Sequence, residues 1–215
     1  MLQVKSFTFN PFEENTYIVF DESKDAVIID PGCYEPYEQK MLESYIDIEG
    51  LTVTKLLNTH CHIDHVLGNH FVKTRYNVSF LMHAADLPVL RAVKSYASNY
   101  GFPGYTEVLP DEMLKEGDIV AVGSGRMSVL FLPGHSPGHI GFYSADERIL
   151  LAGDVLFCRS IGRTDLPGGD METLLTSIHQ KLFGLPDDVV VHPGHGPTTT
   201  LGEEKISNPF CALPV

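Results

Sequence analysis

Ligand-type side chains cluster directly after one predicted strand. The apolar run Val53–Leu57 is followed by Asn58. From Thr59 to His65 the chain then reads Thr-His-Cys-His-Ile-Asp-His. In an extended chain, residues i and i+2 point to the same side, so His60 and His62 can converge on one point. The start of a helix then turns Asp64 and His65 toward a second point nearby. This spacing of four ligand-type residues predicts a metal site.

Three more ligand-type residues follow short apolar runs elsewhere in the chain. They close the sequences Leu-Pro-Gly-His at His135, Leu-Ala-Gly-Asp at Asp154 and His-Pro-Gly-His at His195. Loops at one edge of a rigid sheet commonly carry functional sites, which favours convergence of these residues. Five imidazoles and two carboxylates suit a pair of borderline divalent metal ions, zinc foremost. The chain carries no evident Ser-His-Asp or Cys-His nucleophile pattern, and metal-dependent chemistry needs none.

Length and composition are those of one globular domain. The chain has 215 residues, of which 43% are hydrophobic and 20% charged, so we expect a single domain over residues 1–215. Lys and Arg number 15 against 28 Asp and Glu, a formal net charge of −13. That excess repels phosphate backbones and anionic lipids, so neither a nucleic acid nor a membrane surface is an expected partner.

The sequence shows no evident signal peptide, membrane-spanning segment or disulfide framework. The first residues lack a cationic start followed by an apolar run, and no stretch approaches the ~18 apolar residues of a membrane helix. Four widely spaced cysteines favour free thiols over a disulfide framework. We therefore expect a cytoplasmic protein.

Two β-rich halves can position these residues. Short alternating or apolar runs bounded by Gly, Pro or Asp predict strands, and runs with apolar residues at helical spacing predict helices. The predicted strands are Val4–Phe9, Thr16–Phe20, Ala26–Ile29, Val53–Leu57, Val78–Met82, Ile119–Val122, Met127–Leu132, Ile140–Tyr143, Ile149–Ala152 and Val189–His192. The predicted helices are Glu35–Ile48, His65–Tyr76, Ala84–Ala97 and Met171–Phe183. Strand clusters followed by helices in both halves predict an α/β protein with helices outside two sheets.

The order of these motifs resembles a known signature. Thr59-His60-x-His62-x-Asp64-His65, then His135, Gly153-Asp154 and Gly194-His195, is similar to the pattern of metallo-β-lactamase-fold hydrolases. The resemblance implies a four-layer α/β/β/α sandwich. The loops Ser160–Asp170 and Pro193–Pro197 look most like those of the hydroxyacylglutathione hydrolase (glyoxalase II) branch, in particular its short bacterial members.

The resemblance also implies roles for the seven residues. One metal ion would take His60, His62 and His135, the other would take Asp64, His65 and His195, and Asp154 would bridge them. The cofactors would be two divalent ions, with zinc favoured and iron or manganese as alternatives. Asp64 and Asp154 would be the catalytic carboxylates: a hydroxide that bridges the two ions attacks the acyl carbon, and Asp64 orients it.

The resemblance favours a binuclear hydrolase that cleaves a thioester of the S-lactoylglutathione type, with a small-molecule partner. Larger glyoxalase II enzymes end in a helical domain, whereas 20 residues follow His195 here, so we expect no such extension. The alternative is a mononuclear iron persulfide dioxygenase, whose loop resembles Gly162–Asp165 and whose ligands would be His60, His135 and Asp154. A metal-binding scaffold without activity is a third interpretation, and the complete ligand set argues against it.

Arg163 has two interpretations. Its guanidinium could hold a substrate carboxylate in a bidentate pair. Alternatively, an ion pair with Asp165 or Asp170 could fix a long loop, and this is the favoured interpretation. Asp30 could equally orient a metal-binding histidine or cap a turn, and we expect a structural hydrogen bond from His139.

Overall fold

Two six-stranded sheets form the centre of the structure, a computed structural model that describes residues 1–214. The first sheet has the order β1-β2-β3-β4-β5-β6 and the second β14-β13-β10-β9-β8-β7. The strands of the first are β1 Gln3–Phe9, β2 Glu14–Phe20, β3 Asp25–Ile29, β4 Thr52–Leu57, β5 Ser79–His83 and β6 Glu112–Leu114. Those of the second are β7 Ile119–Val122, β8 Gly125–Phe131, β9 Ile140–Ser144, β10 Ile149–Gly153, β13 Val190–Pro193 and β14 Thr199–Thr200.

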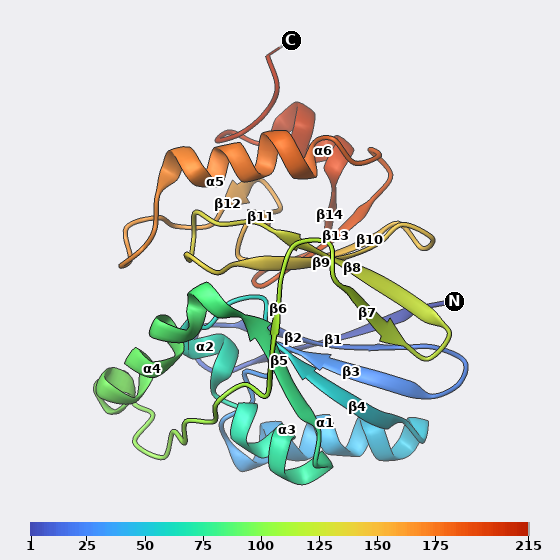
Figure 1. The fold of residues 1–215 in the computed structure, drawn as a ribbon, viewed down its shortest axis with the longest axis vertical. Helices are drawn as coiled ribbons and strands as arrows, with labels where there is room; N and C mark the ends of the chain where they lie inside the picture. Colours follow the sequence, from blue (N-terminus) through green and yellow to red (C-terminus); the bar gives the residue numbers. More distant parts are fainter. Residues whose placement is uncertain (215) are drawn as a thin grey trace.

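Helices cover the outer face of each sheet, as Figure 1 shows. On the first sheet lie α1 (Pro36–Glu49) and α3 (Asn69–Tyr76), and on the second lie α5 (Met171–Ser177) and α6 (Leu201–Ser207). The remaining elements are α2 Ile63–Val66, η1 Ala84–Asp86, α4 Leu87–Tyr96, η2 Ala97–Tyr100, η3 Ile178–Leu182 and the hairpin of β11 Leu156–Phe157 and β12 Ser160–Ile161. The predicted four-layer sandwich with helices outside is confirmed.

Three apolar clusters hold the layers together. Neighbouring side chains of a strand point to opposite faces, so Ile18 and Ile28 pack under the helices of the first sheet, whereas Val19 and Val27 pack between the sheets. A third cluster, which includes Leu174, lies between the second sheet and its helices. Strand β2 is buried along its whole length because both of its faces are covered.

The chain leaves its first histidine cluster, His60–His65, through two short helices. We predict one helix over His65–Tyr76, but the structure has α2 and α3 with a break at Gly68. The N–H group of Gly68 donates a hydrogen bond to the carbonyl of Pro31 over 2.7 Å, and a Cβ atom at this position would lie 2.6 Å from the sulfur of Cys33. Close packing against the loop after β3 therefore interrupts the helix, which the apolar spacing alone does not reveal.

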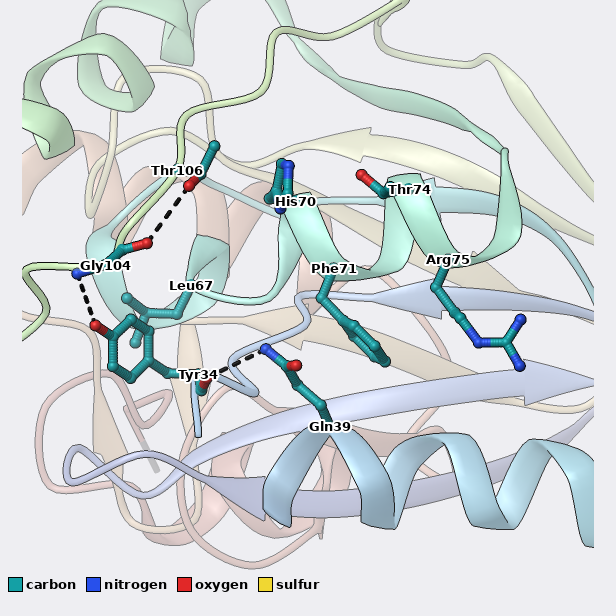
Figure 2. A pocket seen from close by; sticks show the side chains of 9 residues that line it. All are labelled: Tyr34, Gln39, Leu67, His70, Phe71, Thr74, Arg75, Gly104 and Thr106. Atoms are coloured by element: carbon teal, nitrogen blue, oxygen red, sulfur yellow. Dashed lines mark hydrogen bonds between the residues drawn. The ribbon is translucent and has the colours of Figure 1, made fainter. Parts of the chain in front are cut away.

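The segment between η2 and β6 is tied to the start of α1. Figure 2 shows the phenol of Tyr34 accepting a hydrogen bond from the backbone N–H of Gly104 over 2.8 Å, while Gln39 donates to the carbonyl of Tyr34. A cavity of about 350 Å³ lies here, with His70 and Arg75 on its wall.

Among residues 1–214, none of the helices combines the length and apolar character that crossing a bilayer requires.

Candidate metal centre

All seven predicted ligand residues lie at one edge of the two sheets. His60 and His62 follow β4, and Asp64 and His65 lie in α2. The other three follow strands of the second sheet: His135 after β8, Asp154 after β10 and His195 after β13. Strands β8, β10 and β13 run in the same direction, because β9 pairs antiparallel with both β8 and β10, and β10 pairs parallel with β13. Their carboxyl ends therefore meet at this edge.

The seven side chains form two groups of donor atoms. Donors of His60, His62 and His135 all lie within 4.8 Å of one another, as do donors of Asp64, His65 and His195. In the first group Nδ1 of His62 is 2.8 Å from Nε2 of His135. In the second, Oδ2 of Asp64 is 3.1 Å from Nε2 of His195 and 3.5 Å from Nε2 of His65. Both groups are large enough to enclose a divalent ion at the usual bond lengths of about 2.0–2.2 Å.

Asp154 lies between the two groups. Its Oδ2 is 3.6 Å from Nε2 of His135 and 3.5 Å from Nε2 of His195. Its Oδ1 is 3.4 Å from Nε2 of His65. Gly194, in the loop after β13, leaves space for this carboxylate, because a Cβ atom at that position would clash with Oδ1 of Asp154. One carboxylate thus faces imidazoles of both groups, the arrangement that a bridging ligand needs.

A protein oxygen contacts the Nδ1 atom of four of the five histidines. Nδ1 of His60 lies 3.1 Å from Oγ1 of Thr59, and Nδ1 of His65 lies 3.2 Å from Oδ2 of Asp30. The backbone carbonyls of Arg163 and Phe12 accept from His135 (2.7 Å) and His195 (3.1 Å). Since an imidazole that donates from Nδ1 keeps its lone pair on Nε2, these contacts set the tautomer that can bind a metal.

The free lone pairs test whether a metal fits. Nε2 of His60, Nε2 of His65 and Oδ1 of Asp154 are buried without a hydrogen-bond partner. Buried polar atoms are normally paired, because an unpaired one costs about 1–3 kcal/mol. Three such atoms in contacting residues, from a nitrogen-rich donor set with two carboxylates, fit divalent metal ions of the zinc, iron or manganese kind.

Burial and neighbouring carboxylates shift the pKa values of these histidines in opposite directions. Burial lowers the pKa of His60 well below its usual value and that of His62 to about 4, so both are neutral at pH 7 and able to ligate. Burial also acts to lower the pKa of His65, but the carboxylates of Asp64 and Asp154 outweigh it and raise that pKa well above its usual value. The carboxylates of the second group therefore favour a cation beside His65, either a proton on its imidazole or a metal ion that displaces that proton.

Asp30 orients the first loop and one histidine together. Its Oδ1 accepts from the N–H of Thr59 (2.7 Å) and from the amide of Asn58 (3.2 Å), while Oδ2 accepts from the hydroxyl of Thr59 and contacts His65. This is the first of the two roles that the sequence left open. His139 accepts a hydrogen bond at Nε2 from the N–H of Asp154 over 3.0 Å, as predicted, and stacks on the ring of His60.

Two buried acids at the site are absent from the sequence-based prediction. Asp86, in η1, accepts three hydrogen bonds: from the N–H of Cys61 (2.7 Å), the hydroxyl of Ser136 (2.6 Å) and the N–H of Gly138 (2.6 Å). It thereby joins the loop of the first histidines to the loop of His135. Glu14 lies fully buried in β2, with Oε1 3.9 Å from Nδ1 of His65. Glu14 lies in the polar run Glu13–Thr16, ahead of the apolar residues of β2, so its surroundings in the sequence do not single it out.

Arg163 is paired with its neighbour rather than free. Its Nε and Nη2 atoms donate to the two carboxylate oxygens of Asp165 over 2.6 and 2.7 Å, which is one of the two ion pairs that the sequence suggested. Asp170 instead caps α5 by accepting from the N–H of Thr173. The backbone of Arg163, not its guanidinium, touches the candidate metal centre through His135.

A cleft of about 940 Å³ opens over the seven residues. Helix α4 contributes one wall, including Val89, Ala92 and Tyr96, and the segment after β10 contributes the other, including Ile161 and Leu166. His62, Asp64, His135, Asp154 and His195 line its floor. The volume lies within the range of small-molecule sites, about 300–1,000 Å³.

Comparison with known proteins agrees with this geometry. The profile of the Metallo-beta-lactamase superfamily matches residues 9–195. Hydroxyacylglutathione hydrolase GloC of Haemophilus influenzae is 38% identical over 211 residues, which cover 97% of this chain and 98% of that protein. The bovine mitochondrial persulfide dioxygenase ETHE1 is 31% identical over an alignment of 218 positions, which covers 99% of this chain and 75% of that protein.

Solved structures give the same result. The crystal structure of the B3 metallo-beta-lactamase BLEG-1 superposes with a TM-score of 0.88 at 37% identity, covering 97% of this chain and 99% of that one. The crystal structure of TTHA1623 in a di-iron-bound form superposes with a TM-score of 0.85 at 38% identity, covering 96% and 99%. The profile match, these identities over nearly the full length and the shared fold together show that the chain belongs to the metallo-beta-lactamase superfamily.

Proposed function

We propose that this member of the superfamily is a binuclear metal-dependent thioesterase that hydrolyses a small-molecule thioester of the S-lactoylglutathione type. The observation that carries the proposal is the position of Asp154, whose two oxygens face imidazoles of both donor groups. Such a carboxylate suits two ions better than one. The similarity to a hydroxyacylglutathione hydrolase over nearly the full length supports the thioester as substrate.

The ligands divide as the two donor groups do. One ion would be held by His60, His62 and His135, the other by Asp64, His65 and His195, with Asp154 shared. Imidazole nitrogens dominate both sets, which suits zinc, and the same donors also bind iron and manganese. A relative with a di-iron centre supports iron as the main alternative.

The residues of the chain then have distinct tasks. The divalent ions that these residues would hold would supply a Lewis acid for the thioester carbonyl and would lower the pKa of water toward about 7. The carboxylate of Asp64, on the floor of the cleft, accepts a hydrogen bond from the attacking water and orients it. The contacts at Nδ1 hold the histidine rings in place. The departing thiol has a pKa of about 8.5, so it leaves as a thiolate without a proton donor.

The first experiment measures metal content and hydrolysis on the same sample. We expect about two divalent ions per chain and hydrolysis of S-lactoylglutathione, at least about 100-fold faster than hydrolysis of the matched oxoester, because the alkoxide lacks a proton donor. His135→Ala should abolish activity, whereas His70→Ala, an exposed histidine on α3, should not. Absence of hydrolysis with zinc, iron and manganese each restored would refute the proposal. So would faster hydrolysis of a β-lactam than of any thioester.

A persulfide dioxygenase is the second candidate, favoured by the similarity to ETHE1. Its single iron would take His60, His135 and Asp154, and Nε2 of His135 does lie 3.6 Å from Oδ2 of Asp154. One tightly held iron per chain, together with oxygen consumption on a glutathione persulfide and no thioester hydrolysis, would establish this alternative.

A further inference from the structure

Helix α4 carries two apolar faces. Leu90 and Val93 are buried in the core under the first sheet. Val89, Ala92 and Tyr96, spaced three and four residues apart, form a second stripe that lines the cleft over the candidate metal centre. In this α4 wall (Val89, Ala92, Tyr96), Val89 and Tyr96 are half-buried and Ala92 is exposed, and contiguous apolar surface that is left accessible often marks a binding site. Figure 1 shows α4 beside α2, at the end of the sheets where the ligand residues lie.

The opposite side of the cleft is apolar too. Ile161 and Leu166 belong to the segment after β10 and line the cleft together with the α4 wall. An elongated apolar group whose end reaches Asp64 and Asp154 on the floor would therefore contact carbon on both sides.

In the part of the chain that the structure describes, the charged side chains that line the cleft lie on its floor, apart from Arg163, whose guanidinium is paired with the carboxylate of Asp165. Among the described residues that line the cleft, Arg163 is the one with a permanently charged cationic side chain. Two of its donors are taken by the carboxylate of Asp165. The chain as a whole carries a net charge of −13. A substrate with two carboxylates, such as a glutathione conjugate, finds few cationic side chains here to pair with them.

We infer that the cleft selects thioesters by an apolar acyl chain, which lies along the α4 wall while the thioester group reaches the metal centre. This inference rests on the thioesterase activity in the proposed function and departs from S-lactoylglutathione as the preferred substrate: an apolar acyl group supplies the binding energy, and the glutathionyl part supplies little. The α4 wall is the specificity-determining surface, and Ala92 lies at its middle.

The test uses the zinc-loaded full chain and thioesters of one neutral thiol, N-acetylcysteamine, with acetyl, butyryl, hexanoyl and octanoyl groups. Each methylene that becomes buried should raise kcat/KM by about fourfold if its full transfer free energy is realised, so we expect a rise of at least tenfold from acetyl to hexanoyl. Exchange of N-acetylcysteamine for glutathione on the same acyl group should change kcat/KM by less than threefold.

Variants on one helix separate the wall from general effects. Ala92→Asp places a charge on the α4 wall and should flatten the dependence on chain length. Ser95→Asp places the same charge on an exposed position of the same helix that does not line the cleft, and should keep the dependence. If Ser95→Asp flattens it equally, the effect is not that of the wall and the inference fails.

Binding of the product carboxylates gives a readout without catalysis. Calorimetry with acetate, butyrate, hexanoate and octanoate should show a Kd that falls with chain length, and Ala92→Asp should remove the trend. A flat series in both hydrolysis and binding, or a gain of more than tenfold from the glutathionyl group, overturns the inference while thioester hydrolysis itself stands. If the protein hydrolyses no thioester, the proposed function fails, and the carboxylate series alone decides whether the wall binds acyl chains.

Discussion

Replacement of one carboxylate oxygen of Asp86 by an amide nitrogen should weaken metal binding, although Asp86 is not among the candidate metal ligands. Its carboxylate accepts from the N–H of Cys61, which lies between two ligand histidines, and from Ser136 and Gly138, which follow His135. Oδ1 takes the two bonds from the second loop, and Oδ2 takes the bond from Cys61. Asp86→Asn keeps one carboxylate oxygen and replaces the other by an NH2 group. At best the remaining oxygen keeps the two hydrogen bonds made at Oδ1, and the NH2 group then faces the N–H of Cys61, so that two donors meet and the N–H loses its acceptor.

The magnitude follows from that mismatch. A buried N–H group that loses its acceptor costs about 1–3 kcal/mol. At about 2–4 °C per kcal/mol for a chain of this size, Asp86→Asn should lower Tm by about 4–8 °C for a 2 kcal/mol loss. Asp86→Ala removes both acceptor oxygens and with them all three hydrogen bonds, and it should cost about 3–5 kcal/mol, because two of the donors are backbone groups that cannot turn away. Displacement of the histidine loop should lower metal affinity by about 10–100-fold.

The assay pairs thermal unfolding with competition against a chelator. Asp21→Asn is the matched control: Asp21 is a buried acid that accepts four hydrogen bonds from Ser23 and Ser124. It follows the far end of β2, about 20 Å from the residues of that strand that contact the metal centre. Asp21→Asn should lower Tm with unchanged metal affinity. Unchanged affinity in a folded Asp86→Asn variant would show that Asp86 does not position the ligands.

Three further outcomes follow from the charged groups. Asp154→Ala should loosen both metal ions, whereas Asp64→Ala should deplete mainly one, and metal analysis that finds both ions retained in Asp154→Ala would refute the bridging role. Arg163→Lys should leave KM within about twofold and change stability little, since the ion pair is exposed; a tenfold rise in KM would instead indicate substrate contact. The hydrogen bond from Arg163 lowers the pKa of Asp165 to about 2. The pair's small stabilisation is therefore present above the unfolded pKa of about 3.9 and is lost as the pH falls toward 2. Carboxylate NMR, which measures the pKa of Asp165 itself, should find it near 2, and Arg163→Gln should return it toward 3.9.

The sequence predicts the site better than it predicts the elements around it. All seven candidate ligands meet because each follows a predicted strand, and strands that share a direction end at one edge of a sheet. The alternation of His60 and His62 needs no tertiary information, since it is a property of extended backbone. The strands β6, β11, β12 and β14 have two or three residues each, too few for a periodic pattern, and the break at Gly68 depends on packing against Cys33.

The partners that orient the ligands are harder to predict for a different reason. Backbone carbonyls of Arg163 and Phe12 fix the rings of His135 and His195, and any residue supplies a carbonyl. No residue type marks such a contact, so no motif records it. Asp86 is marked by type, but its three donors lie 25 to 52 positions away in the chain. Residue type therefore identifies the atoms that can bind a metal, whereas long-range backbone geometry decides which of their lone pairs are free to do so.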